Sequence, residues 1–257
     1  MIASARHLYI MNRLNEQGIV DYKTIASEMN ISEATVRRDF EKLENQGKLK
    51  RVQGGAVGSE ADGSETNEAG EAELTMRLKH TLNSSEKLAI AQEAAELVQP
   101  GQCVFLDSGT TLIPLADLLV KKNVQIVTYS SLILKSLYNT NANLIIIGGK
   151  YSKPDGMFYG PLAESTLRQF NFDHAFIGCS GVDIKTGSVF STELAEFHMK
   201  QIAIENSDHV SLLMDESKFQ KKGLLKFASF GDFDVVFCTT TGQNRVLPDN
   251  FRVVNME

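Results

Sequence analysis

The sequence predicts two domains: a small one with three short helices and a β-hairpin, and a larger open α/β domain with a mainly parallel sheet. Near the start of the chain, apolar residues recur with helical spacing. From residue 84 onward, short apolar runs rich in β-branched residues alternate with helical patterns, as in a buried parallel sheet. A chain of 257 residues is also too long for one small domain.

The segment that begins at Ser32 predicts a helix with one packing face and one polar face. The Ser32 hydroxyl can cap the first backbone N–H groups of a helix that starts at Glu33. Val36, Phe40 and Leu43 recur at i, i+4 and i+7, so they share the face that packs. The rest of the helix offers hydroxyl and basic groups to a DNA groove. The residues expected to contact DNA there are Ser32, Ala34, Thr35, Arg37, Arg38 and Lys42.

The flanking segments complete a winged helix-turn-helix pattern. A helix is expected from Tyr22 to Met29, opened by Asp21, after a first amphipathic helix. Downstream, charged and apolar residues alternate and Gly54-Gly55 predicts a tight reversal, which places Lys50 and Arg51 on a basic hairpin. This arrangement reads double-stranded DNA, which is therefore the expected partner. An ordinary three-helix domain with solvated arginines is the alternative.

Charge divides the chain into three parts. Residues 1–57 hold 9 basic and 7 acidic residues, 58–73 hold 6 acidic and no basic ones, and 74–257 hold 17 and 19. We therefore expect a DNA-binding domain over 1–57, a flexible acidic linker over 58–73 and an effector and oligomerisation domain over 74–257. The DNA-binding domain has a small positive net charge and can make few phosphate contacts, so a single copy would bind DNA weakly. We therefore expect a homo-oligomer, either a dimer or a tetramer. Inhibition of the head by the acidic linker is an alternative to a simple spacer.

The sequence lacks the signals that mark several other classes of protein. Apolar stretches are too short for a membrane span and a signal-peptide pattern is missing, so a cytoplasmic protein without a membrane partner is expected. Cys103, Cys179 and Cys238 have no paired spacing and the histidines no ligand spacing, so neither disulfides nor a metal site are expected. The P-loop and dinucleotide fingerprints are missing too, and no cofactor is expected.

Six apolar runs are the expected strands of the larger domain, and a polar loop follows most of them. These runs are Cys103–Leu106, Val124–Val127, Leu144–Ile147, His174–Ile177, Val210–Met214 and Val235–Cys238. In an open α/β sheet, ligands bind beyond the carboxyl ends of the strands. The loops should therefore line one crevice.

The loop after the first of these strands suits a phosphate. Gly109, Thr110 and Thr111 open an apolar helix from Leu112 to Leu119. The run offers backbone N–H groups, two hydroxyls and the positive end of a helix dipole. Its position between a strand and a helix therefore predicts an anion site.

Other loops carry groups that can complete such a site. Lys218 lies just beyond the fifth strand and can add a positive charge, although a solvated surface lysine is the alternative. Asp107 and Glu193 can accept hydrogen bonds from sugar hydroxyls, or can instead cap a helix or brace a loop. The crevice is therefore expected to bind an anionic, hydroxylated ligand.

Taken in order, these motifs resemble the DeoR family of bacterial transcriptional regulators over nearly the whole chain. The head carries Ser32–Asp39 followed by Gly54-Gly55-Ala56, and the body carries Asp107–Thr111, Asp173–Gly181 and Asp215–Phe219. The resemblance implies a winged helix-turn-helix head and a sensor domain similar to ribose-5-phosphate isomerase. It further implies repression of sugar catabolic genes until a phosphorylated sugar or related metabolite binds. Two departures are Tyr129, where many members carry Asn, and the longer, more acidic linker.

The resemblance also assigns roles within the crevice. By motif, Gly109, Thr110 and Thr111 would hold the phosphate, Ser130 and Lys218 would assist, and Gly178, Gly181 and Glu193 would face the sugar. The full set of expected effector-binding residues is Asp107, Gly109, Thr110, Thr111, Ser130, Gly149, Gly178, Gly181, Glu193 and Lys218.

The alternative function is a sugar-phosphate isomerase-like enzyme that carries a DNA-binding head. Isomerisation needs a positioned base and an oxyanion stabiliser. Asp183 and Glu193 are available as acids, and Lys200 or Lys218 as the cation. An acid pair cannot be assigned from their spacing, so we expect no catalytic residues and no enzyme. A ligand-free adaptor is disfavoured by the many Gly, Ser and Thr residues at strand ends.

Overall fold

The computed structural model describes residues 3–17, 19–52, 54–58, 79, 82–219, 221–240 and 246–255. Contacts divide the chain into two compact units, Met1–Leu82 and Asn83–Glu257, called here the head and the body. Apart from Gly58, the segment 58–73 lies outside the described residues, and the linker stays a prediction. Within the described part of the chain, no helix is long and apolar enough to cross a membrane.

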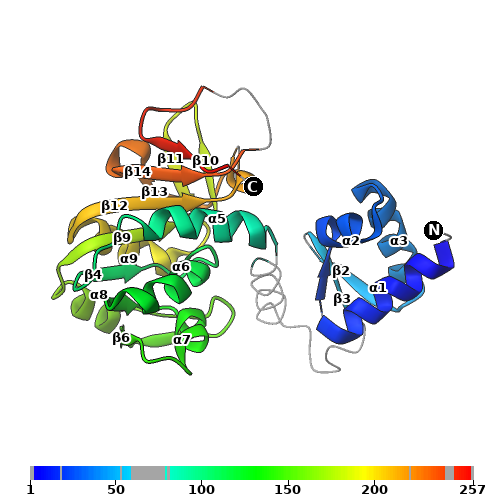
Figure 1. Ribbon diagram of the computed structural model, residues 1–257, viewed down its shortest axis with the longest axis horizontal. Coiled ribbons are helices and arrows are strands. Elements are labelled where there is room, and N and C mark those ends of the chain that lie inside the picture. Colours follow the sequence, from blue (N-terminus) through cyan, green and yellow to red (C-terminus); the bar gives the residue numbers. More distant parts are fainter. Residues whose placement is uncertain are drawn as a thin grey trace. The chain divides into compact units, whose positions relative to one another are not determined.

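The head has the helices that its capping residues predict. Its elements are α1 (Ala3–Gln17), β1 (Ile19–Asp21), α2 (Tyr22–Met29), α3 (Glu33–Asn45), β2 (Leu49–Val52) and β3 (Gly55–Gly58), labelled in part in Figure 1. The Asp21 carboxylate accepts a hydrogen bond from the Thr24 N–H and so caps α2, which ends where Asn30 adopts a left-handed conformation. The Ser32 side chain caps α3 in the same way. The predictions for α2 and α3 are confirmed.

The wing differs from the prediction at its turn. Val52 pairs with Gly55, so Gly55 is the first residue of β3 and does not belong to the turn. Gly54 has a φ of +97°, a conformation that favours glycine. The sequence analysis also did not predict β1, which pairs antiparallel with β3 and completes a three-stranded sheet. Three residues are too few for an alternating pattern to reveal a strand.

A buried carboxylate joins α1 to α3. Asp39 is 1% exposed and accepts hydrogen bonds from Arg6 Nε at 2.6 Å and Arg6 Nη2 at 3.0 Å. His7 Nε2 lies 3.1 Å from Oδ1, the oxygen that Arg6 Nη2 also contacts. Burial raises the pKa of Asp39, but the hydrogen bonds from Arg6 and His7 outweigh it and the pKa falls below its ordinary value. The contact fixes how α3 lies on the head.

The body is built on one seven-stranded parallel sheet. In spatial order its strands are β15 (Phe251–Val253), β14 (Val235–Cys238), β12 (Ser207–Met214), β9 (Phe172–Gly178), β4 (Cys103–Leu106), β5 (Gln125–Thr128) and β6 (Asn143–Ile146). All six expected strands are present. The edge strand β15 was missed because its residues are neither uniformly apolar nor β-branched.

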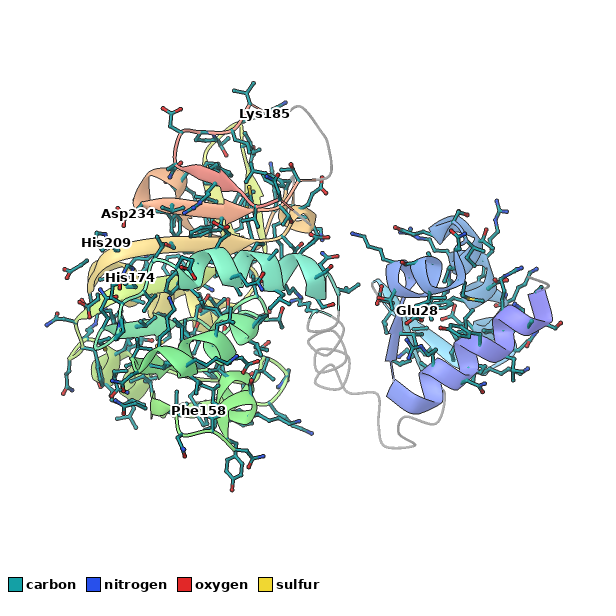
Figure 2. All side chains as sticks on the ribbon, in the orientation of Figure 1. Glu28, Phe158, His174, Lys185, His209 and Asp234 are labelled. Carbon is teal, nitrogen blue, oxygen red and sulfur yellow. The ribbon has the colours of Figure 1, made fainter. Side chains whose placement is uncertain are left out.

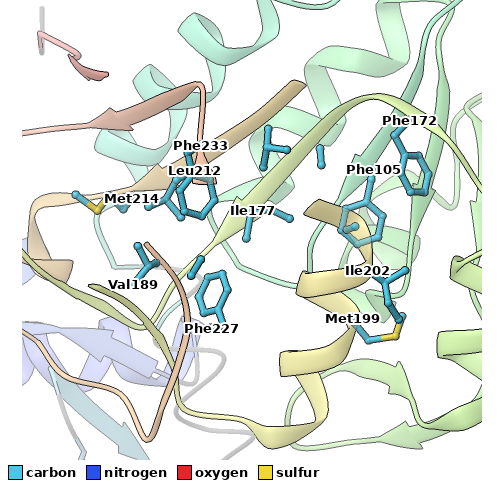
Figure 3. Packing of buried hydrophobic residues seen from close by; sticks show 14 of the residues in the cluster. Phe105, Phe172, Ile177, Val189, Met199, Ile202, Leu212, Met214, Phe227 and Phe233 are labelled. Atoms are coloured by element: carbon cyan, nitrogen blue, oxygen red, sulfur yellow. The ribbon is translucent and has the colours of Figure 1, made fainter. Parts of the chain in front are cut away.

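Helices cover both faces of this sheet (Figure 1). The first face packs on α5 (Ser84–Ala95), α6 (Leu112–Leu119) and α7 (Ser131–Leu137), and the second on α8 (Pro161–Leu167) and α9 (Leu194–Glu205). Val104 and Leu106 of β4 belong to the first core, while Phe105 between them belongs to the second, which Figure 3 shows. This alternation is why the strands read as continuous apolar runs.

The body also contains two smaller β-structures that the sequence analysis did not predict. One is a hairpin of β7 (Lys150–Ser152) and β8 (Met157–Tyr159), and the other is a sheet of β10 (Gly181–Asp183), β11 (Ser188–Ser191) and β13 (Leu225–Ser229). Their strands are short and mix polar with apolar residues, so periodicity does not reveal them.

We predict that Asp39→Asn destabilises the head, because it removes the negative charge that Arg6 and His7 contact. The expected loss is about 1.5–3 kcal/mol of unfolding free energy, the range for hydrogen bonds to charged groups. Urea unfolding followed by circular dichroism measures it. Glu41→Gln, an exposed change on the same helix, is the control, and an equal effect of both variants would contradict the role given to Asp39.

Candidate functional site

The exposed side of α3 gathers the DNA-binding residues expected from the sequence. Ser32 Oγ accepts the Thr35 N–H at 3.3 Å, and the two hydroxyl oxygens lie 2.9 Å apart. Val36, Phe40 and Leu43 are fully buried against the head. The residues exposed on the other side are Ala34, Arg37, Arg38 and Lys42. The helix therefore presents hydroxyls at its N-terminus and cations along one exposed surface.

Two of the expected arginines have partners within the head. The Arg37 guanidinium lies 5.1 Å from the centre of the Tyr22 ring, and its Nη2 lies 3.5 Å from Glu33. Arg51 donates to Glu44 through its backbone N–H at 2.8 Å and through Nε at 2.5 Å. Arg51 thus ties the wing to the end of α3. Lys50 beside it is exposed.

The body has a topological switch point between β4 and β9. From β4 the chain continues to β5 and β6 on one side, and then returns to place β9, β12, β14 and β15 on the other. Loops that leave the carboxyl ends of β4 and β9 therefore diverge, and crevices form at such points. The Asp107–Thr111 loop follows β4, and the loop from Gly178 to Ser180 follows β9.

Asp107 lies at the switch point with no exposed surface. The Tyr129 hydroxyl donates to its Oδ1, the Gly178 N–H donates to Oδ2 at 2.8 Å, and Lys200 Nζ contacts Oδ2 as well. Lys200 also donates to the Gly178 carbonyl at 3.1 Å. Asp107 therefore braces the ends of three neighbouring strands, the second of the two roles that the sequence left open. Tyr129, noted only as a departure from the family pattern, supplies one of its donors.

A second carboxylate, Glu196, completes this buried cluster. It accepts hydrogen bonds from Ser108 Oγ at 2.7 Å and Ser191 Oγ at 2.8 Å, and lies 3.3 Å from Lys200 Nζ. Burial lowers the pKa of Lys200, but Asp107 and Glu196 outweigh it and raise the pKa above its ordinary value. The lysine therefore stays charged. Sequence reasoning missed Glu196 and considered Lys200 only for an enzyme, because a Glu-Lys pair four residues apart is typical of exposed helix surfaces.

The expected phosphate loop lies beside this cluster. Gly109 and Gly178 approach closely, since a Cβ on Gly178 would lie 3.5 Å from the Gly109 Cα. Thr110 is half-buried and Thr111 is 5% exposed. Within the described structure, the Thr111 side chain makes no capping hydrogen bond to α6. The Leu112 N–H donates to the Gly109 carbonyl at 3.0 Å and Pro114 has no N–H, so the first turn of α6 offers the Ile113 N–H to an anion.

Lys218 lies in a charged group at the end of β12. Asp215, 1% exposed, accepts hydrogen bonds from the Ser217 N–H and Asn83 Nδ2, both at 2.9 Å. Burial raises the pKa of Asp215, but Lys218, the Ser217 hydrogen bonds and Lys87 outweigh it, so the pKa lies below its ordinary value. Lys87 of α5, which is buried, is a second cation that acts on this carboxylate, and the sequence analysis did not identify it.

Cys179, in the loop after β9, is half-buried, and its environment disfavours the thiolate. Burial raises the pKa of its thiol to about 12, although Lys218 and Lys200 oppose the shift. The thiolate is the reactive form of cysteine, and its population is negligible near neutral pH.

The remaining expected residues have structural roles of their own. Ser130 is fully buried and caps α7 through the Ile133 N–H at 3.4 Å. A Cβ on Gly149 would lie 2.6 Å from the Tyr159 carbonyl oxygen, and one on Gly181 would collide with the Lys221 backbone. The Lys221 segment thus covers Gly181. Glu193 stands at the N-terminal boundary of α9, where its N–H donates to Ser191 Oγ at 3.3 Å.

A hollow of about 370 Å³ lies among the amino-terminal parts of β9, β12 and β14, away from the switch point. His174, His209 and Asp234 line it, and Figure 2 labels them together. The two imidazole rings lie 5.3 Å apart, and His209 Nδ1 is 3.7 Å from Asp234 Oδ2. His174 Nδ1 is the one buried side-chain polar atom without a hydrogen-bond partner among the residues that the structure describes. Within the same residues, no cluster suits a metal ion.

Comparison with family models matches both units of the chain. A model described as the DeoR-like helix-turn-helix domain matches residues 6–61. A second, described as the DeoR C terminal sensor domain, matches residues 82–239.

Similar proteins come from several bacteria. The chain is 32% identical to the helix-turn-helix regulator FruR of Bacillus subtilis strain 168, over 98% of this chain and 96% of that protein. It is 33% identical to the L-fucose operon activator of Haemophilus influenzae (95% and 92%) and 29% identical to the glycerol-3-phosphate regulon repressor of Escherichia coli K12 (92% and 91%). Among solved structures, ribose 5-phosphate isomerase A of Methanocaldococcus jannaschii is 20% identical, with a TM-score of 0.39 over 53% of this chain and 55% of that one.

We predict that His174 makes the body less stable in acid. Burial and then His209 lower its pKa, while Asp173, Asp234 and Asp208 oppose them. Protonation therefore favours the unfolded chain, and stability falls as pH drops below about 6.5, by at most about 1.4 kcal/mol per pH unit. Urea unfolding between pH 7 and 5 should show a shallower loss for His174→Asn than for wild type. The exposed His198→Asn is the control, and identical slopes for all three proteins would refute the prediction.

Proposed function

The chain belongs to the DeoR family of transcriptional regulators, and we propose that it represses sugar catabolic genes until a phosphorylated sugar binds its body. It is a DNA-binding regulator with a winged helix-turn-helix head and an α/β sensor domain. The repressor from Escherichia coli supports repression, while the Haemophilus influenzae relative is an activator. The direction of control is therefore part of the proposal.

The surface of α3 is the observation that carries the DNA-binding part. Its Ser32 cap, exposed arginines and buried opposite face give a helix that can enter a major groove by its N-terminal end. Exposed Lys50 on the wing suits a phosphate contact. Because Arg51 pairs with Glu44, we assign it to holding the wing rather than to reading DNA.

The start of α6 carries the effector part. The Ile113 N–H, the Thr110 hydroxyl and Lys218, whose charge acts on Cys179 beside Gly178, are suited to a phosphate. The switch point is where an open sheet binds ligands. Glu196, a carboxylate that accepts a hydrogen bond from a hydroxyl, stands next to this loop. A phosphorylated sugar combines both kinds of group.

Organisation and location follow from this function. We assign DNA binding to residues 1–57, a linker to 58–73, and sensing and oligomerisation to 74–257. A dimer or tetramer would pair two heads on one operator, which raises affinity by an effective-concentration term. An operator-binding regulator of a bacterial operon acts in the cytoplasm.

An isomerase activity is less well supported by the geometry. Asp183, one of the acids considered, accepts the Lys185 N–H at 2.9 Å in the turn between β10 and β11. Asp107 is sealed from solvent and Lys200 is bound to it. We therefore propose a sensor without catalytic residues.

Two measurements test the proposal together. Thermal shift of the full chain against a panel of sugar phosphates identifies the effector, since a ligand at 100 times its Kd stabilises the bound domain by about 2.7 kcal/mol. A gel shift with operator DNA, with and without that ligand, then tests control. A chain that binds operator but responds to no sugar phosphate would overturn the effector part alone.

We predict that Arg38→Ala weakens operator binding by about 1–3 kcal/mol if its guanidinium contacts a base edge. Arg37→Ala should cost less, because Arg37 also contacts Tyr22 and Glu33. Gel-shift titration at fixed salt gives both affinities. Thermal shift with the effector should be unchanged in each variant, and wild-type operator affinity in both would remove the recognition role of α3.

We predict that Lys218→Ala and Thr110→Ala bind operator normally but respond poorly to the sugar phosphate. Lys218→Ala should lose more, because hydrogen bonds to charged groups contribute about 1.5–3 kcal/mol and neutral ones about 0.5–1.5 kcal/mol. An effector shifts DNA affinity only through unequal binding to two conformations, so such variants stay on the operator. Operator affinity with and without effector measures this, and a wild-type response in Lys218→Ala would place the phosphate elsewhere.

A further inference from the structure

Solvent reaches only one of the two carboxylates at the switch point. The Glu196 side chain is 15% exposed, whereas Asp107 has no exposed surface and Lys200 is 2% exposed. Glu196 lies in the first turn of α9. A ligand at the switch point can therefore touch Glu196 without displacing the groups that brace the strands.

The hydrogen bonds of Glu196 leave room for one more donor. A carboxylate has about four acceptor sites. Among the described contacts, Ser108 and Ser191 donate to Glu196 and Lys200 lies beside it. Asp107 also has three such contacts, but its remaining site is closed to solvent.

Glu196 is an acceptor that favours hydroxyls over phosphates. Burial raises its pKa, but Lys200 and the hydroxyls of Ser108 and Ser191 outweigh burial, and the pKa lies below its ordinary value. An ionised carboxylate binds an O–H donor more strongly than a neutral group does, and it repels a phosphate. Asp107 and Glu196 together exceed the single charge of Lys200, which strengthens that repulsion.

The chain links this acceptor directly to the phosphate loop. Ser108, which donates to Glu196 at 2.7 Å, is the residue before Gly109. The start of α6 and Lys218 provide positive potential, while Glu196 provides negative potential. The two ends of the site thus select two different groups of one ligand.

Resting on the proposed function, we propose that Glu196 is the specificity-determining residue that accepts a hydroxyl of the effector. The site therefore selects phosphorylated sugars and polyols over phosphate compounds that lack hydroxyl groups. This role belongs to Glu196 rather than to Asp107, which braces the strand ends.

The test compares Kd values of the full-length wild type and Glu196→Gln by calorimetry. The probes are fructose 1-phosphate, glucose 6-phosphate, glycerol 3-phosphate and inorganic phosphate. We expect Glu196→Gln to raise the Kd of the hydroxylated phosphate that the wild type binds best by about tenfold, since it replaces a charge-assisted hydrogen bond with a neutral one. The Kd of inorganic phosphate should stay the same or fall. Glu205→Gln, at the exposed end of the same helix, should match wild type for every probe.

A second variant keeps the proposal testable if Glu196→Gln does not fold. Glu196→Asp keeps the charge beside Lys200 but withdraws the carboxylate by one methylene, so the same selective loss is expected. Wild-type selectivity in the folded Glu196 variants would overturn the assignment. So would an equal loss for inorganic phosphate, which would indicate general distortion of the site. A wild type that binds no hydroxylated phosphate would overturn the proposed function itself, and the assignment with it.

Discussion

A carboxylate sealed from water must be neutralised and hydrogen-bonded, and Asp107 imposes this requirement on the centre of the body. Its partners are Tyr129, which directly follows β5, Gly178 at the end of β9, and Lys200 of α9. Removing one partner from such a buried ion pair costs about 3–5 kcal/mol, because the remaining charge stays uncompensated. The ends of three adjacent strands are consequently held in one arrangement. The expected phosphate loop begins at Gly109, directly after Ser108, so the same arrangement fixes its position.

The helix α9 connects this polar centre to the apolar core. Met199, Ile202 and Ala203 pack in the core beneath the sheet, while Glu196 and Lys200 reach the switch point from the same helix. Apolar packing therefore positions the charged pair. Close packing in the core opposes any shift of α9. A ligand that displaces Glu196 therefore acts against this packing, which gives a physical basis for transmitting a binding event through the body.

Local signals explain which parts of the structure could be predicted. Asp21 and Ser32 cap their helices through short-range hydrogen bonds, and Leu112–Leu119 forms α6 with the expected bounds. What the sequence missed depends on contacts between distant segments. Lys200 lies 93 residues from Asp107, and an i,i+4 Glu-Lys pair carries no sign of burial. The pairing of Arg51 with Glu44 and the register that places Gly55 in β3 are likewise set by tertiary packing.

Crowding around Gly149 and Gly181 affects how mutations at the expected effector-binding residues should be interpreted. Gly149 and Gly181 have backbone atoms where a Cβ would stand, so any side chain there forces the chain apart whether or not a ligand is present. Intolerance at these positions records steric exclusion within the protein and carries no information on recognition. Gly109 differs, because a Cβ there would meet the flexible Leu112 side chain at 3.1 Å. A small residue at that point therefore requires a side-chain shift of Leu112 rather than a movement of the backbone.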